Sequence, residues 1–152
     1  MGILKSRHEY KKLSREEKHS KECRLCKIKK QHVIKSFKNW TWVFSEFPYY
    51  KYHTMLVPKS HILRFHQLNN DEILELLSII KEIEFIYKKS RVIGKKSKYG
   101  TQLLIFWRSR YWAPDKKFVE HLHMHFCPEF GGAWDTILDD NAHEIDLKRI
   151  RV

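Results

Sequence analysis

Three histidines alternate with large apolar residues near the C-terminal end of the chain, in the run His121-Leu122-His123-Met124-His125-Phe126. Successive side chains of a β-strand point to opposite faces, so this run predicts a strand with the three imidazoles on one face and Leu122, Met124 and Phe126 on the other. A helix would spread the same imidazoles over more than half a turn. Pro128 cannot donate a ladder hydrogen bond and predicts the end of the strand. The alternation therefore predicts one buried face and one face open to chemistry.

Imidazoles that share one face have two explanations. Surface histidine pairs and metal sites are common, so solvated side chains or a bound metal would account for the stripe. A phosphate site is the sharper alternative, because imidazole has an unperturbed pKa of about 6.5 and serves near neutral pH as nucleophile, proton carrier or hydrogen-bond donor. The run by itself leaves both explanations open.

A second segment, residues 47–61, reads Phe-Pro-Tyr-Tyr-Lys-Tyr-His-Thr-Met-Leu-Val-Pro-Lys-Ser-His. Together with the alternating histidines it resembles the two signature motifs of the histidine triad (HIT) superfamily of nucleotide hydrolases and transferases, in its zinc-containing branch with a Cys-x-x-Cys pair. The resemblance covers about residues 23–128. It implies an α+β fold, in which an antiparallel sheet of about five strands packs against one long helix.

The hydrophobic pattern of the chain predicts compatible elements. The segment Asn69-Asn70-Asp71-Glu72 offers a helix N-cap with acidic first-turn residues, and apolar residues at i, i+3, i+4 spacing predict a helix that runs to about Lys89. Its apolar stripe is expected to pack on the sheet. Strand-forming residues occupy three further stretches: 33–47, which contains a turn near Lys38-Asn39, 54–57, and 101–107.

The length of 152 residues predicts one domain with a real core. Residues 1–22 are mostly charged, which predicts a basic, flexible or weakly helical extension ahead of a HIT-like domain at 23–152. The chain has no apolar run of membrane-spanning length and no N-terminal signal pattern, so we expect a soluble, cytoplasmic protein without a membrane partner.

A formal net charge of +12, from 30 Lys and Arg against 18 Asp and Glu, produces a field that attracts polyanions such as nucleotides and nucleic acid. Lysine-rich sequences also arise from AT-rich genomes. The charge alone therefore does not establish nucleic-acid binding.

Cys23 and Cys26 have the spacing that lets two thiolates bind one tetrahedral metal, normally zinc. The pair supplies half of a coordination sphere, and two reduced cysteines without metal are the alternative. The resemblance implies that His61 and His121 complete a structural Zn²⁺ site, because zinc-carrying relatives take one ligand from each of these motif positions.

The resemblance also implies roles for the residues around the phosphate. It makes His123 the nucleophile on the α-phosphorus and His125 a donor to a non-bridging phosphate oxygen. His121 orients the neighbouring ring through its backbone carbonyl, and His53 is a fourth imidazole that positions the site. Ser45 stands where relatives carry an Asp or Asn that contacts the ribose.

Two features depart from the family pattern. Tyr52 replaces the glycine that usually precedes His53, so a positive φ there carries a steric cost. The segment before the histidine run lacks the Asn and the Gly-Gln-Ser-like turn whose groups help to hold the phosphate. We expect cationic side chains to neutralise the phosphate oxygens instead. The candidates are Arg108, Arg110, Lys116 and Lys117.

The motifs are most similar to those of the branch that acts on dinucleoside polyphosphates or adenylylated small molecules, through a covalent nucleotidyl-histidine. Two alternatives stay open: removal of AMP from adenylylated nucleic-acid ends, as in aprataxin-like members, and a non-catalytic, zinc-stabilised nucleotide- or RNA-binding module. Relatives often form homodimers, and the sequence leaves a homodimer and a nucleic-acid partner undecided.

Overall fold

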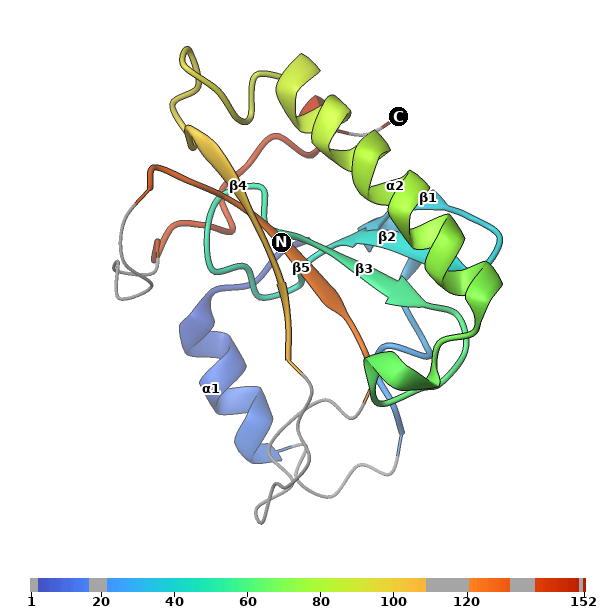
Figure 1. The fold of residues 1–152 in the computed structure, drawn as a ribbon. Helices are drawn as coiled ribbons and strands as arrows, with labels where there is room; N and C mark the ends of the chain where they lie inside the picture. Colours follow the sequence, from blue (N-terminus) through green and yellow to red (C-terminus); the bar gives the residue numbers. More distant parts are fainter. Residues whose placement is uncertain (1–2, 17–21, 109–120, 132–138, 151) are drawn as a thin grey trace.

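The computed structural model describes residues 3–16, 22–108, 121–131, 139–150 and 152 (Figure 1). Its helices and strands are, in chain order, α1 (Arg7–Glu16), η2 (Lys30–His32), β1 (Val33–Ser36), β2 (Trp40–Phe44), β3 (Thr54–Pro58), η3 (Phe65–Gln67), α2 (Asn70–Lys89), β4 (Gln102–Trp107), β5 (Met124–Glu129) and η4 (Leu147–Arg149). No helix among the described residues is long and apolar enough to cross a membrane.

The strands form one antiparallel sheet in the order β1-β2-β3-β5-β4, and α2 lies across one of its faces (Figure 1). The predicted α+β architecture, with five strands and one long helix, is therefore confirmed. The first three strands follow one another as a meander, whereas β5 inserts between β3 and β4. This insertion brings the histidine run beside the segment that carries His53.

The core lies between α2 and the sheet. Ile79, Ile83 and Tyr87 of the helix are at most 2 % exposed and belong to the same buried cluster as Trp42 and Phe126 of the sheet. Burying each such side chain stabilises the fold by about 1.5–3 kcal/mol relative to leaving it in water. The helical stripe is thus core, as its spacing predicts.

The start of α2 follows the predicted capping pattern. Asn69 Oδ1 accepts the backbone N–H of Glu72, and the Glu72 carboxylate accepts the N–H of Asn69, each at 2.9 Å. The same carboxylate also accepts the Ser60 hydroxyl at 3.1 Å. Because Ser60 immediately precedes His61, the helix N-terminus anchors the loop that carries a predicted metal ligand.

The histidine run is only partly a strand. Its apolar residues Leu122, Met124 and Phe126 are buried in the core, as the alternation predicts, but β5 begins at Met124. The ladder to β3 ends at the pair Leu56–Met124. Pro58, two residues further along β3, has no N–H with which to extend the ladder. His121 and His123 consequently precede the strand, although the alternation of faces continues through them.

A buried chain of hydrogen bonds connects α2 with the turn before His53. The Tyr87 hydroxyl donates to the Tyr52 carbonyl at 2.6 Å and lies 2.8 Å from the Thr54 hydroxyl, which accepts the Trp42 indole N–H at 2.8 Å. Tyr52 has a φ of 63°, so the tyrosine at the usual glycine position does adopt the left-handed conformation. This conformation costs a non-glycine residue about 1–2 kcal/mol, which the bond from Tyr87 helps to offset.

Replacing Tyr87 by Phe should lower the free energy of unfolding by about 1–3 kcal/mol, because the Thr54 hydroxyl and the Tyr52 carbonyl would each lose a partner in the protein interior. Urea denaturation measures the change. Tyr50→Phe is the matched control, because Tyr50 is a half-buried tyrosine whose side chain lies outside this series of hydrogen bonds. Equal stabilities of the two variants would contradict the role assigned to the Tyr87 hydroxyl.

Candidate functional site

Two buried imidazoles from adjacent strands form the centre of the site. His53 and His125 are 1 % and 6 % exposed, and His53 Nε2 lies 2.9 Å from His125 Nδ1. Thr54 and Met55 of β3 pair with Phe126 and His125 of β5, and this register places the two rings side by side.

The backbone fixes which nitrogen of each ring carries the proton. The Tyr49 N–H donates to His53 Nδ1 at 3.0 Å, so that nitrogen must be the acceptor. A neutral His53 then has its proton on Nε2 and donates it to His125 Nδ1. A neutral His125 in turn has its proton on Nε2, which is left as a hydrogen-bond donor.

His123 carries its proton on the other ring nitrogen, Nδ1. Its Nδ1 lies 2.7 Å from the His121 carbonyl oxygen, and because a carbonyl only accepts, Nδ1 carries the proton. The lone pair is therefore on Nε2. The rings of His123 and His125 meet edge to face at a centroid distance of 4.7 Å. The site thus pairs one imidazole that offers a lone pair with one that offers an N–H.

Burial keeps these rings neutral. It is the main cause that lowers the pKa of His53 to about 3, and the charges of His123 and Arg7 lower it further. Burial likewise lowers the pKa of His125 far below its usual range, followed by the charges of His53 and His123. The pKa of His123 is also lowered, chiefly by burial, although its bond to the His121 carbonyl opposes the shift. Near neutral pH the tautomers described above are therefore the dominant forms.

Two aromatic side chains pack against the imidazole pair. Phe106 of β4 stacks on it with a centroid distance of 4.5 Å and an interplanar angle of 15°. Tyr49 stacks on His53 at 4.9 Å and 18°, and lies 5.8 Å from His125. Neither Phe106 nor Tyr49 has a role in the sequence-based prediction, because their contribution depends on which strands become neighbours.

A cluster of two thiols and two imidazoles lies next to this site, formed by Cys23, Cys26, His61 and His121. Cys23 Sγ lies 3.3 Å from His121 Nδ1, and Cys26 Sγ lies 3.1 Å from His61 Nδ1. All four donor atoms lie within 4.8 Å of one another. The four predicted metal ligands, which come from three separate parts of the sequence, are thus brought together.

The donor set fits a tetrahedral metal ion. With Zn–S of about 2.3 Å and Zn–N of about 2.0 Å, a sulfur and a nitrogen ligand lie about 3.5 Å apart, close to the separations found here. His121 Nε2 lies 2.9 Å from the Pro58 carbonyl oxygen and donates to it, which leaves the Nδ1 lone pair directed toward the thiols. Cys23, Cys26, His61 and His121 could therefore hold a metal.

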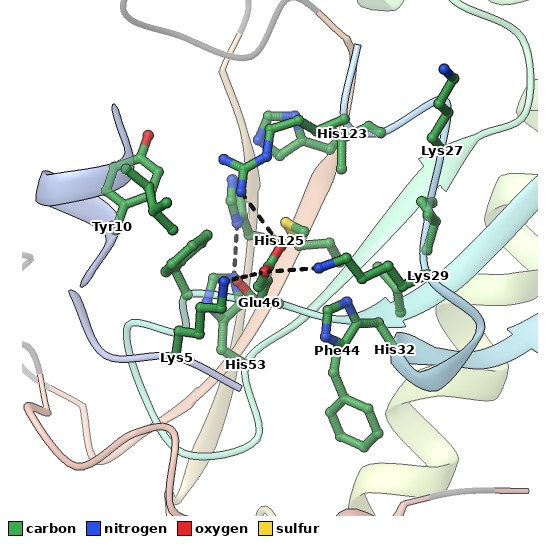
Figure 2. A pocket seen from close by; sticks show the side chains of 18 of the residues that line it. Lys5, Tyr10, Lys27, Lys29, His32, Phe44, Glu46, His53, His123 and His125 are labelled. Atoms are coloured by element: carbon green, nitrogen blue, oxygen red, sulfur yellow. Dashed lines mark hydrogen bonds and ion pairs between the residues drawn. The ribbon is translucent and has the colours of Figure 1, made fainter. Parts of the chain in front are cut away.

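A cavity of about 430 Å³ opens in front of the imidazoles (Figure 2). His53, His123 and His125 form part of its wall, and Ser45, which is 5 % exposed, lines it as well. Glu46 lies among three cations, with carboxylate–nitrogen distances of 3.3 Å to Lys5, 3.5 Å to Arg24 and 3.7 Å to Lys29. The cavity can therefore admit a ligand of nucleotide size and anionic character.

Of the cationic side chains predicted to neutralise phosphate oxygens, the structure describes only Arg108. Arg108 directly follows β4, and its positive charge contributes to the lowered pKa values of His123 and His125. Arg110, Lys116 and Lys117 lie outside the described residues. Cations that the sequence-based prediction did not single out, Lys5, Arg7 and Arg24, line the cavity from the N-terminal segment. This segment has no hydrophobic period that would predict its position.

A family model described as HIT domain matches residues 27–108. The chain belongs to the HIT family. An uncharacterised HIT-like protein of Methanocaldococcus jannaschii is 27 % identical over 103 residues, which cover 68 % of this chain and 72 % of the relative. The family-model match includes β1 to β4, while the histidine run at the start of β5 lies beyond it.

Solved structures of HIT proteins share the fold. A histidine triad nucleotide-binding protein from Candida albicans has a TM-score of 0.58 at 18 % identity, covering 79 % of this chain and 87 % of its own. A diadenosine triphosphate hydrolase from Plasmodium falciparum has a TM-score of 0.56 at 17 % identity, covering 77 % and 71 %. A zinc-bound histidine triad family protein from Mycobacterium smegmatis has a TM-score of 0.53 at 16 % identity, covering 74 % and 76 %.

The buried, neutral state of His53 predicts a loss of stability in mild acid. The unfolded chain takes up a proton at this residue near pH 6.5, whereas the folded chain does so only near its pKa of about 3. The free energy of unfolding should therefore fall by about 1.4 kcal/mol per pH unit as the pH drops from about 6.5 toward 3. His125, whose pKa is lowered in the same direction, adds a loss of the same sign.

Urea denaturation of the native protein and of His53→Gln between about pH 7 and 5 tests this prediction. The difference between the two curves reports on His53 together with its coupling to His125, since contributions from titrating groups outside this pair and from bound metal are common to both. The native protein should lose stability more steeply. Parallel curves would show that His53 titrates alike in the folded and unfolded states.

Proposed function

We propose that this protein is a nucleotide hydrolase or nucleotidyltransferase in which His123 attacks the α-phosphorus of an adenylyl group. The observation that supports it most directly is the pair of opposed tautomers: a lone pair on His123 Nε2 beside an N–H on His125 Nε2. Attack on phosphorus requires the lone pair of His123, and stabilisation of a phosphate oxygen requires the N–H of His125. Neutral imidazoles at near-neutral pH meet both requirements.

In the first step a bond forms between His123 Nε2 and phosphorus, while the bond from phosphorus to the leaving group breaks and its electron pair departs with that group. In the second step water, or another hydroxyl acceptor, attacks phosphorus and expels the imidazole. A leaving group that needs a proton takes it from solvent in the first step, and the acceptor's proton passes to solvent in the second. The pathway replaces one displacement at an anionic phosphorus by two easier ones.

The other histidines position these two groups. His125 donates its Nε2 proton to a non-bridging oxygen, where negative charge grows in the transition state, and His53 holds it in that tautomer. The His121 carbonyl orients His123, so that the nucleophile is tied to the residue that also belongs to the metal cluster. We assign ribose binding to Ser45, which lines the cavity, and binding of phosphate oxygens to Arg108. The same role for Lys116 and Lys117 remains a prediction from the sequence.

For the substrate, we favour dinucleoside polyphosphates or adenylylated small molecules. The cavity volume of about 430 Å³ and its cationic lining suit a nucleotide with additional phosphates. The name of the structurally similar Plasmodium falciparum diadenosine triphosphate hydrolase points the same way. Adenylylated nucleic-acid ends and a binding role without catalysis are the alternatives that the experiment below separates.

Replacing His123 by Gly should abolish release of AMP from a dinucleoside polyphosphate, lowering kcat by at least about 1000-fold. Chromatography measures AMP, and intact-mass analysis after an alkaline quench should find one added adenylyl group on the native chain only. Adenylylated DNA serves as the parallel substrate. If the native chain and the His123→Gly variant are both inert toward every adenylyl donor while nucleotide binding persists, the protein is a binding module.

We further propose that the metal is structural Zn²⁺. Two thiolates and two imidazoles are a usual closed zinc set, and a zinc-bound HIT protein has a similar fold. The metal would link the loop at Cys23 and Cys26 to His121, whose carbonyl orients His123. It supplies rigidity at this position and takes no part in the displacement.

Purified protein should contain about one zinc per chain by elemental analysis, and Cys26→Ser should lose most of it and melt at a lower temperature. His66→Ala is the matched control, because His66 is an exposed histidine outside the cluster. Retention of the full zinc content by Cys26→Ser would exclude this ligand assignment.

We also propose a homodimer formed through β4. This strand is an edge of the sheet, its central residues are only half-buried, and Trp107 at its end is 44 % exposed. Within the sheet that the structure describes, β4 pairs with β5 alone, and an apolar edge strand favours pairing with another chain. Sedimentation velocity distinguishes a dimer from a monomer.

We propose a cytoplasmic location for the protein, because a reducing environment would keep the two zinc-binding thiols available.

A further inference from the structure

The N-terminal segment forms one wall of the cavity. Leu4 is 5 % exposed in the core, the backbone N–H of Lys5 donates to the Glu46 carbonyl at 2.8 Å, and the Ile3 carbonyl lies 3.1 Å from His32 Nε2. These contacts place residues 3–5 along the end of β2. Figure 2 shows Lys5 and Tyr10 from this segment facing the same space as His53 and His125.

Arg7, the first residue of α1, is held in a defined position in this wall. Its guanidinium carbon lies 4.5 Å from the ring centroid of Tyr10 and 4.5 Å from that of Tyr49. Its Nη1 donates to the Phe47 carbonyl at 3.4 Å. Two aromatic faces and one carbonyl fix the plane of the guanidinium and leave most of its five N–H groups available.

Within the described part of the chain Arg7 forms no ion pair with a carboxylate, whereas Lys5, Arg24 and Lys29 share Glu46. A half-buried cation in a cavity, with no carboxylate of the described residues paired to it, favours an anionic ligand.

The position of Arg7 indicates which part of a nucleotide it meets. Tyr49 contacts both groups, since the guanidinium carbon of Arg7 lies 4.5 Å from its ring centroid and the same ring stacks on His53 at 4.9 Å. Arg7 therefore lies on the side of the His53–His125 pair, where its charge contributes to the lowered pKa of both residues. The charge of Arg108 lowers the pKa of His123 as well as that of His125. In an in-line displacement the leaving group departs on the side of phosphorus opposite the nucleophile.

We propose that Arg7 binds the phosphate oxygens of the leaving group and makes this site selective for nucleotides whose leaving group is itself a phosphate. The inference rests on the proposed function and names its substrate class. A polyphosphate leaving group presents oxygens that a guanidinium binds by charge-assisted hydrogen bonds, whereas the neutral amine of a nucleoside phosphoramidate presents none. Arg7 is then a specificity-determining residue.

Two substrates that share the adenylyl group test the inference: diadenosine tetraphosphate and adenosine 5′-phosphoramidate. Arg7→Gln keeps a polar side chain and removes the charge. We expect kcat/KM to fall about 10- to 100-fold for the polyphosphate and by a clearly smaller factor for the phosphoramidate. Arg7→Lys should recover part of the polyphosphate activity. Lys12→Ala, an exposed cation on the same helix, controls for the general positive field.

A merely structural role for Arg7 would lower both activities by the same factor, and that result would overturn the inference. Equilibrium binding of ATP and AMP gives an independent readout that needs no turnover: Arg7→Gln should weaken ATP binding more than AMP binding. If the native protein releases AMP from neither substrate, the proposed function fails, but the ratio of ATP affinity to AMP affinity still tests the role of Arg7. An Arg7→Gln variant with the same affinity ratio as the native protein would overturn the role proposed for Arg7.

Discussion

The hydrogen bond from the Tyr49 backbone N–H to His53 Nδ1 determines the chemistry of this site. A backbone amide can only donate, so it sets the proton of His53 on Nε2, and His53 then sets the proton of His125. Burial keeps both rings neutral and prevents the alternative in which each nitrogen is a donor. A main-chain group in the turn after β2 thereby decides which ring nitrogen of His125, a β5 side chain, is left as a hydrogen-bond donor.

His121 connects two neighbouring sites through different atoms. Its side chain belongs to the Cys23–Cys26–His61 cluster through Nδ1 and bonds to Pro58 through Nε2, while its carbonyl accepts the proton of His123 Nδ1. A shift of the ring would move the peptide that aims His123. The candidate metal site and the proposed nucleophile therefore have a common mechanical support.

The sequence predicted the elements whose pattern is local. The alternation of Leu122, Met124 and Phe126 and the capping pattern at Asn69 follow from spacing and residue type, and the structure agrees. The fold class followed from the family resemblance, and the structure agrees with it as well. The signature motifs also predicted which four residues meet at the metal cluster. The start of β5 was misplaced, because the effect of Pro58 depends on the register of a distant strand.

The N-terminal wall was beyond prediction for a physical reason. Arg7 and Lys5 lie in a charged segment without hydrophobic period, so only three-dimensional contacts with Tyr49 and Glu46 give them a position. The same holds for Phe106, which reaches His125 because β4 and β5 become neighbours. Such residues carry no signature in one sequence, since their role is created by the packing of segments far apart in the chain.

The pairing of His53 with His125 joins residues that are 72 positions apart. During synthesis the meander of β1, β2 and β3, followed by α2 and β4, leaves the ribosome before β5, the strand that joins β3 to β4 in the sheet. Until β5 is made, β3 has no partner on that side and His53 has no His125 beside it. Insertion of the late strand therefore completes the sheet and the imidazole pair in a single event.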